Sequence, residues 1–287
     1  MPGNARINAF ISAGDTRLAG TDSGIFVSHD EGQSWHAAAG AAASSGRVVT
    51  FATLGQSVYA GTDRSGMLVS HNEAATRRVD AGFPSKNVRC LLQEQGKLYA
   101  GTDAEGVFLS SDRGGSWKQL TEGFPSLAQV FALTALKGKL FAALYSKGLY
   151  TWDDGNRRWS KTGPVSPLVL ATIGDTLVAG HNPGGIYTSD DLGATWSKAT
   201  LNAFGDLASS LPDRPGELSS DAPVWELASG AGRLFAGAAS GIYYSEDNGR
   251  SWTRARIGLP EESPGVAFLV RREVILAATL VRTTQAR

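Results

Sequence analysis

The sequence predicts an all-β protein that folds as a single β-propeller of four-stranded antiparallel blades. Three observations carry this prediction. Of the 287 residues 35 are glycine, a short motif recurs about every 41 residues, and each repeat holds four short β-type runs separated by turn residues. Frequent glycine without a collagen period indicates many tight turns. Four short strands in a repeat of this length are typical of a propeller blade.

The recurring motif is Ser or Thr, then Asp two places on, Gly two places further and Trp three places after the Gly. Its intact copies are Ser28 to Trp35, Ser110 to Trp117, Ser189 to Trp196 and Ser245 to Trp252. The copy at Asn72 has lost its Gly and Trp, and the copy at Asp153 carries its Trp one place late, at Trp159. Successive Asp or Asn markers are 42, 40, 41, 38 and 56 residues apart, which establishes an internal repeat.

A second unit of the type Leu-Tyr-Ala-Gly precedes each motif. Its copies begin at Arg17, Val58, Leu98, Leu140, Leu177, Leu234 and Ile275. Seven such units against six Asp motifs predict a seven-bladed propeller whose last blade is incomplete. Six blades with an appended hairpin are the alternative. A single domain over 1–287 is expected, with repeats at approximately 6–46, 47–86, 87–128, 129–165, 166–222, 223–263 and, in part, 264–287.

The motif resembles the Asp box, or BNR repeat, and the resemblance covers nearly the whole chain. Such boxes occur in sialidases, xyloglucan-degrading propellers, the sortilin ectodomain family and photosystem II assembly factors. In repeat style the chain looks closest to the assembly-factor-like and uncharacterised BNR proteins. The resemblance implies a sialidase-like propeller fold with each box at the turn between the third and fourth strands. It implies no single activity, because these families differ in function.

The chemistry of the box itself indicates a structural role. An Asp at a turn accepts backbone N–H groups that have no partner in the sheet, and the Gly permits a positive φ. The Trp is large enough to fill the wedge between blades. Isolated carboxylates on separate blades cannot share a metal ion, so we expect neither a metal nor a cofactor. The structural set is Asp30, Asp112, Asp153, Asp191 and Asp247.

Composition excludes several classes of protein. The 27 basic and 27 acidic side chains cancel, which disfavours a nucleic-acid binder that neutralises phosphates. No apolar run approaches the roughly 20 residues of a membrane span, so a soluble protein is expected. The single Cys90 makes no intramolecular disulfide. The chain as written fits the cytoplasm, or an exported protein from which a signal peptide has been removed.

A binding site is expected at the mouth of the central channel, on the face opposite the Asp boxes. Arginines occur near the starts of the first three innermost strands. The loops between the second and third strands follow a common turn pattern in most repeats, but those of the fourth and fifth repeats depart from it. On one innermost strand an acid replaces a residue that is small in the other repeats. The ligand-binding candidates are Arg6, Arg47, Arg89, Tyr145, Lys147, His181, Asn182, Trp225 and Glu226.

Two features leave alternatives open. Burying Glu226 unpaired would cost several kcal/mol, so a partner such as Arg47 or Arg89 is expected, as a structural ion pair or as a channel-mouth acid. The long interval before Asp247 places an insertion at 201–223. It is either a lid, a docking segment or a neutral loop.

These observations predict a ligand- or protein-binding propeller, with a small molecule, a glycan or a protein as its partner. A carbohydrate-active or other small-molecule enzyme at the same mouth is the alternative. A sialidase is disfavoured, because the start reads Arg6-Ile-Asn8 without the expected Pro. A glycosidase needs two carboxylates that flank the scissile bond, and no spacing in the sequence selects such a pair.

Overall fold

The computed structural model describes residues 6–40, 46–71, 77–79, 83, 85–181, 184–201, 223–230, 232–238, 241–255, 265–271 and 274–279. The chain divides into two compact units, Met1–Thr162 and Gly163–Arg287. All regular elements in the described ranges are β-strands, and each hairpin within a sheet is antiparallel. This agrees with the predicted all-β fold.

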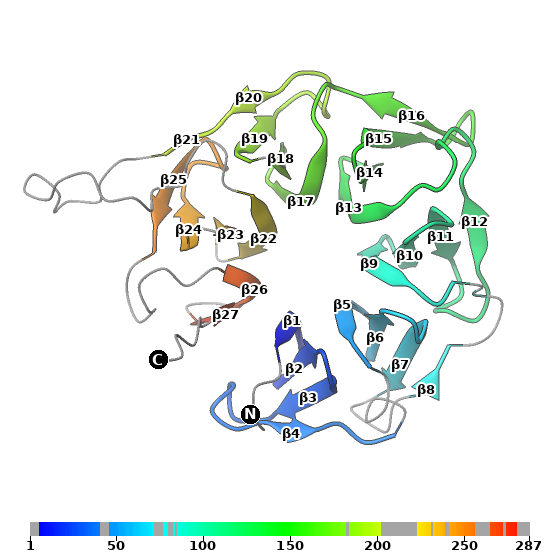
Figure 1. The fold of residues 1–287 in the computed structure, drawn as a ribbon, viewed down its shortest axis with the longest axis vertical. Coiled ribbons are helices and arrows are strands. Elements are labelled where there is room, and N and C mark those ends of the chain that lie inside the picture. Colours follow the sequence, from blue (N-terminus) through cyan, green and yellow to red (C-terminus); the bar gives the residue numbers. More distant parts are fainter. Residues whose placement is uncertain are drawn as a thin grey trace, which may run out of the picture. The chain divides into compact units, whose positions relative to one another are not determined.

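The first unit consists of four four-stranded sheets, coloured blue to green in Figure 1. Their strands are β1 (Ile7–Ala13), β2 (Thr16–Thr21), β3 (Gly24–Ser28) and β4 (His36–Ala37); β5 (Val48–Leu54), β6 (Ser57–Thr62), β7 (Met67–His71) and β8 (Arg77–Arg78); β9 (Val88–Glu94), β10 (Lys97–Thr102), β11 (Val107–Ser110) and β12 (Lys118–Leu120); and β13 (Val130–Leu136), β14 (Lys139–Leu144), β15 (Gly148–Asp153) and β16 (Arg158–Thr162). Each sheet is ordered as in the sequence, so each is one propeller blade.

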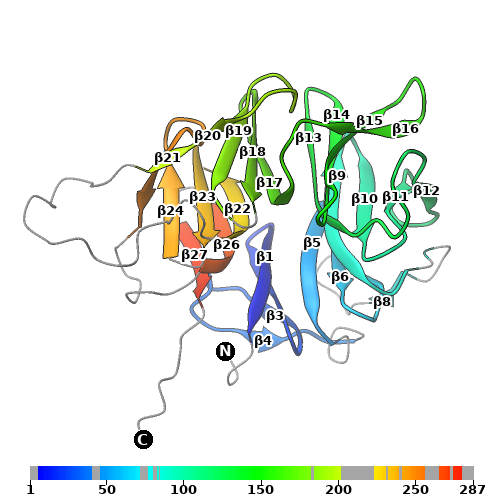
Figure 2. The ribbon, with the colours of Figure 1, turned by 45° about the horizontal axis from the view of Figure 1, so that its top comes forward.

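The second unit holds two further blades and a hairpin. Its strands are β17 (Pro167–Ile173), β18 (Thr176–His181), β19 (Ile186–Ser189) and β20 (Ser197–Lys198); β21 (Thr200–Leu201), β22 (Val224–Gly230), β23 (Arg233–Ala238), β24 (Gly241–Ser245) and β25 (Ser251–Arg254); and β26 (Gly265–Arg271) and β27 (Val274–Thr279). β21 pairs in parallel with the outer edge of β25 and so covers an edge that would otherwise be open. β22 and β26 lie side by side in both views (Figures 1 and 2).

The expectation of seven blades is wrong: in the described residues the propeller has six four-stranded blades. The seventh Leu-Ala unit does form β27, but β27 pairs with β26 alone in a two-stranded sheet. The Asp motif supplies the turn between the third and fourth strands, and it occurs only six times. The number of Leu-Tyr-Ala-Gly units therefore exceeds the number of blades, whereas the number of Asp motifs equals the number of four-stranded blades.

Neighbouring blades meet where the second strand of one blade touches the first strand of the next. The glycine that ends each Ala-Gly pair has no room for a side chain. A methyl group on Gly61 would lie 2.7 Å from Val88 Cγ1, and one on Gly180 would lie 2.9 Å from Val224 Cγ1. Both valines are fully buried. The Gly in the repeat thus sets how closely the blades approach.

The Asp box closes the turn between the third and fourth strands. In the third blade, Asp112 Oδ1 accepts hydrogen bonds from Ser116 N and Ser110 Oγ, both at 2.8 Å, and Oδ2 accepts one from Ser116 Oγ at 2.6 Å. Gly114 has a φ of 82°, in the region that favours glycine. The hydrogen bonds, that from the Ser116 side chain first, lower the pKa of Asp112 to about 2. The same arrangement recurs at Asp30, Asp191 and Asp247, and a shorter variant of it at Asp153.

We predict that Asp112→Asn destabilises the protein in a pH-dependent way. The carboxyl pKa is lower in the folded chain than its ordinary value of 3.8. Its contribution to stability is therefore fully present above about pH 4 and is lost as the pH falls through the folded-state value of about 2. Urea unfolding at a series of pH values should show a free-energy difference between wild type and variant that shrinks over this window. A difference that stays constant down to pH 2 would contradict the assignment.

Candidate functional site

The first strand of every blade, and β26 of the final hairpin, has a β-bulge at its second residue; these strands are called the inner strands. In the third blade, Gly101 pairs with Cys90 but Thr102 pairs with Val88, so Arg89 is the extra residue. Bulges occur next to binding sites because they redirect a side chain out of the ladder. The bulged residues are Asn8, Val49, Arg89, Phe131, Leu168, Trp225 and Val266. They differ from blade to blade, so one variable side chain is presented per repeat.

In the first unit three of these bulged residues line a hollow of about 210 Å³. We call it the mouth hollow, and it is lined by Arg47, Val49, Asp63, Asn87, Val88, Arg89, Asp103 and Phe131. The residues come from the starts of β5, β9 and β13 and from the β6–β7 and β10–β11 loops. These loops precede the third strands, whereas the Asp boxes follow them. The hollow is therefore at the end of the unit opposite the boxes.

Two of the candidate arginines, Arg47 and Arg89, line the mouth hollow, and each forms an ion pair with a carboxylate. Arg89 Nε lies 2.6 Å from Asp103 Oδ1, and Arg47 Nε lies 3.3 Å from Asp22 Oδ1. All four side chains are between 30% and 49% exposed to solvent. Pairs this exposed contribute about 0–1 kcal/mol, so a ligand can displace either carboxylate at small cost. Both guanidinium groups remain accessible donors.

An aromatic row extends from the hollow to the surface. The Arg89 guanidinium lies over the Phe131 ring at 4.6 Å from its centroid, a cation–π contact. Phe131 stacks on Tyr145, with centroids 4.9 Å apart and planes 21° apart. The Tyr145 side chain is 43% exposed. Nearby in sequence, Lys147 donates from Nζ to the Ser126 carbonyl at 3.3 Å.

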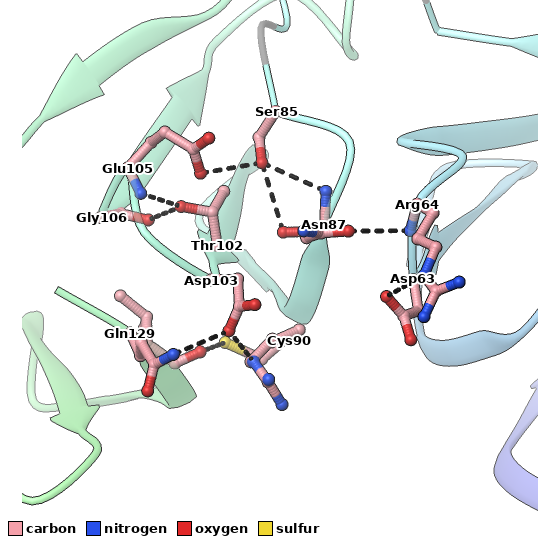
Figure 3. A network of polar contacts seen from close by, with 12 residues as sticks. Asp63, Arg64, Ser85, Asn87, Cys90, Thr102, Asp103, Glu105, Gly106 and Gln129 are labelled. Atoms are coloured by element: carbon pink, nitrogen blue, oxygen red, sulfur yellow. Dashed lines mark hydrogen bonds and ion pairs between the residues drawn. The ribbon is translucent and has the colours of Figure 1, made fainter. Parts of the chain in front are cut away.

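A polar network fixes the loops around the hollow (Figure 3). Ser85 Oγ donates to Glu105 Oε2 at 3.0 Å, and the Arg64 backbone N–H donates to Asn87 Oδ1 at 2.9 Å. Gln129 Nε2 donates to Asp103 Oδ1 at 3.3 Å and so ties the third blade to the fourth. The donors and acceptors are therefore held in place before any ligand arrives.

The carboxylates at this end repeat from blade to blade. In each of the first three blades, the backbone N–H of one loop Asp donates to the carbonyl of the residue just before the blade's first strand. The pairs are Asp22 with Arg6, Asp63 with Arg47, and Asp103 with Asn87. Each of these Asp residues follows a Thr, and the repeated Thr-Asp pair is typical of a turn, so the sequence did not predict the Asp side chains as arginine partners. Their position in the same loop of each repeat was the signal available. Arg6 itself is exposed and is not among the residues that line the mouth hollow.

The other candidates lie in the second unit or outside the described residues. His181 ends β18, its ring lies 5.7 Å from the Tyr187 ring, and burial, followed by the charge of Lys198, lowers its pKa. Trp225, a bulged residue, is 39% exposed. Asn182 lies outside the described residues, as does all of the predicted insertion except Leu201 and Pro223.

Glu226 stands where the other inner strands carry small residues. In the register it faces Gly237, as Cys90 faces Gly101 and Val169 faces Gly180. Burial raises its pKa to about 8. Its expected partners Arg47 and Arg89 pair with Asp22 and Asp103 instead, and the described part of the chain offers Glu226 no ion pair.

The described ranges hold no group of three or more His, Cys, Asp or Glu side chains that could bind a metal ion. No helix among these residues is long and apolar enough to cross a membrane. Cys90 is half-buried, and desolvation of its thiol raises the pKa to about 12, which favours the thiol over the reactive thiolate near neutral pH.

Comparison with known families agrees with this architecture. Residues 26–37 match the BNR/Asp-box repeat, and residues 90–216 match the family described as DUF6242 beta propeller domain. The chain carries the BNR/Asp-box repeat. The predicted resemblance is thereby confirmed, although each match spans less than half of the chain. A search of curated proteins gives no sequence match.

Solved structures show the same fold at low identity. The extracellular domain of BT4673 from B. thetaiotaomicron aligns with a TM-score of 0.76 at 16% identity, over 97% of this chain and 38% of that one. YCF48 from Cyanidioschyzon merolae gives 0.68 at 12%, over 97% and 94%, and YCF48 bound to D1 peptide gives 0.69 at 17%, over 97% and 90%. The GH74 xyloglucanase from Xanthomonas campestris gives 0.69 at 16%, over 96% and 51%. The chain thus spans about two fifths of the BT4673 structure, and at these identities the likeness shows the fold alone.

We predict that Glu226→Gln stabilises the protein at alkaline pH. A carboxyl whose pKa is raised from 4.5 to about 8 destabilises the folded chain increasingly as the pH rises between these values. The gain should be on the order of 2–4 kcal/mol at pH 9 and small near pH 5. Glu226→Val, which installs the residue found at the equivalent Val169, should show the same pH trend. Chemical denaturation at both pH values measures it, and an equal gain at both would refute the buried acid.

Proposed function

We propose that the chain binds a peptide segment of a protein partner at the mouth hollow of its first unit. The observation that carries this proposal is the row Arg89–Phe131–Tyr145, which runs from inside the hollow to an exposed ring. Arg and Tyr are the side chains most often responsible for binding energy in protein interfaces, because they combine apolar area with directed hydrogen bonds.

The polarity of the hollow favours a peptide over a free anion. Its two arginines are balanced by Asp22 and Asp103, and Asp63 adds a further acceptor. A site with fixed donors and fixed acceptors matches the N–H and C=O groups of an extended backbone. The exposed Tyr145 offers a face for an apolar or aromatic side chain of the same segment.

The preformed network supports the same proposal. Hydrogen bonds from Ser85, Arg64 and Gln129 hold the loops of the hollow in place. A site that is ordered before binding loses less conformational entropy when its ligand arrives. A structure with the same fold, that of YCF48, has been solved bound to D1 peptide. The YCF48 complex is an example of a propeller of this fold with a bound peptide, and it supports the proposal to that extent.

Peptides selected from a random linear display library on the wild-type protein test the proposal. Arg89→Ala and Tyr145→Ala should each weaken their binding by about tenfold or more, close to 1.4 kcal/mol. Arg158→Ala removes another exposed arginine, on the outer strand β16, and serves as the matched control, with affinity unchanged within about twofold. Fluorescence anisotropy measures the affinities. Peptides that bind all three variants equally well would exclude the mouth hollow.

A carbohydrate-active enzyme is the second candidate, and one observation favours it. Glu226 keeps its proton near neutral pH, as a general acid requires. Within the mouth hollow, by contrast, Asp103 accepts hydrogen bonds from both Arg89 and Gln129, and both bonds favour its ionised form over a proton donor. Turnover of a glycoside panel that disappears in Glu226→Gln would favour the enzyme. Equal rates in wild type and variant would exclude Glu226 as the general acid of such an enzyme.

A further inference from the structure

The Trp of an Asp box occupies a defined space against the preceding blade. Trp117 of the third blade packs into a cluster with Tyr59 and Val79 of the second. Trp252 of the sixth blade packs in the same way against Val178 of the fifth, and it is 1% exposed. This indole ring fills the wedge between adjacent blades in the outer part of the molecule.

The second blade lacks this Trp. β8 begins at Arg77, which pairs with Val69, just as β4 begins at His36, which pairs with Val27. The residue before β4 is Trp35, whereas the residue before β8 is Thr76. Neither Thr76 nor Arg77 is aromatic, so the box of the second blade supplies no indole ring to the wedge between the first and second blades.

A cavity of about 230 Å³ lies in that wedge. Its Phe51 is larger than the counterpart Leu91, but five other wall residues are the same size as, or smaller than, their counterparts in the cluster that holds Trp117. In order along the chain these are Leu18 for Tyr59, Ile25 for Met67, Ala38 for Val79, Ala60 for Ala100 and Leu68 for Phe108. The cavity therefore lies in the wedge to which the box of the second blade supplies no Trp, and three of these five wall residues are smaller than their counterparts in the cluster that holds Trp117.

We propose that this cavity, the wedge cavity, binds an indole-sized planar aromatic group. Apolar cavities of about 150 Å³ take up benzene. The wedge cavity is larger, is lined in part by Leu, Ile, Val and Phe, and opens to solvent beside the exposed His36 and Ala37, so a bicyclic ring can enter it. His29, His36 and Ser70 stand on its border and make that part of the wall polar. The chain itself shows the fit, because equivalent wedges in other blades hold Trp117 and Trp252.

The wedge cavity is separate from the mouth hollow. It is lined by residues of β2 to β4 and β5 to β7, and it shares no lining residue with the hollow. Its occupant is therefore independent of the peptide proposed above. A free aromatic molecule and a tryptophan side chain of a partner share the required chemistry.

Titration calorimetry with indole tests the proposal on the full chain. Wild type should bind indole saturably at one site. Leu18→Phe with Leu68→Phe installs the aromatic character found at the equivalent positions Tyr59 and Phe108, fills the wedge cavity and should weaken indole binding about tenfold or more. N-acetyltryptophanamide distinguishes the sources: its binding points to a peptide side chain, and its failure alongside indole binding points to a free aromatic molecule.

The matched control is Leu127→Phe, the same chemical change at a side chain that is 75% exposed and outside the cavity. It should bind indole like wild type. Trp117→Ala provides the converse arm, since it opens the equivalent wedge in the next pair of blades and should add a second indole site. Absence of saturable binding to wild type, or undiminished binding to the filled double variant, would overturn the proposal. Each of these outcomes is readable even if Trp117→Ala does not fold.

Discussion

The close approach of a glycine to the next blade is the contact on which the rest of the structure depends. Methyl groups on Gly20, Gly61 and Gly101 would each lie 2.7 Å or less from a Cγ1 atom of the following blade's valine. Protein interiors are packed too tightly to absorb such overlaps without displacement of one blade. The recurrent Ala-Gly pair thus determines the spacing of the blades within each unit.

This spacing determines what the two ends of a blade can do. At one end, the residue after the packed valine leaves the ladder as a bulge, and its side chain differs from blade to blade, as Val49, Arg89 and Phe131 show. At the other end, the Asp box closes the turn with side-chain hydrogen bonds and sends its Trp into the wedge. One end is therefore open to functional change, while the other is occupied by structural residues except where the box is incomplete.

The sequence predicted the blade architecture because the repeat records local requirements. Asp112, Gly114 and the Ala-Gly pair each satisfy a backbone need within a few residues, so the motif can be recognised without knowledge of the fold. The number of blades was predicted wrongly, because β26 and β27 have the inner-hairpin pattern of a blade but no third and fourth strand paired with them in the described residues. The Asp motif, which joins a third strand to a fourth, occurs six times against seven Leu-Tyr-Ala-Gly units, so the count of these units exceeds the number of complete blades.

The candidate site was predictable in part. Variation at the starts of the inner strands indicated Arg47 and Arg89, and Tyr145 was indicated by its departure from the loop formula. The pairing of these arginines with Asp22 and Asp103, and the stacking of Phe131 between Arg89 and Tyr145, join residues of different hairpins and blades. The sequence by itself determined the repeat, the turns and the residue types offered at each end. The tertiary structure alone decided which side chains meet, because the bulge and the glycine contact set directions and distances that no local pattern contains.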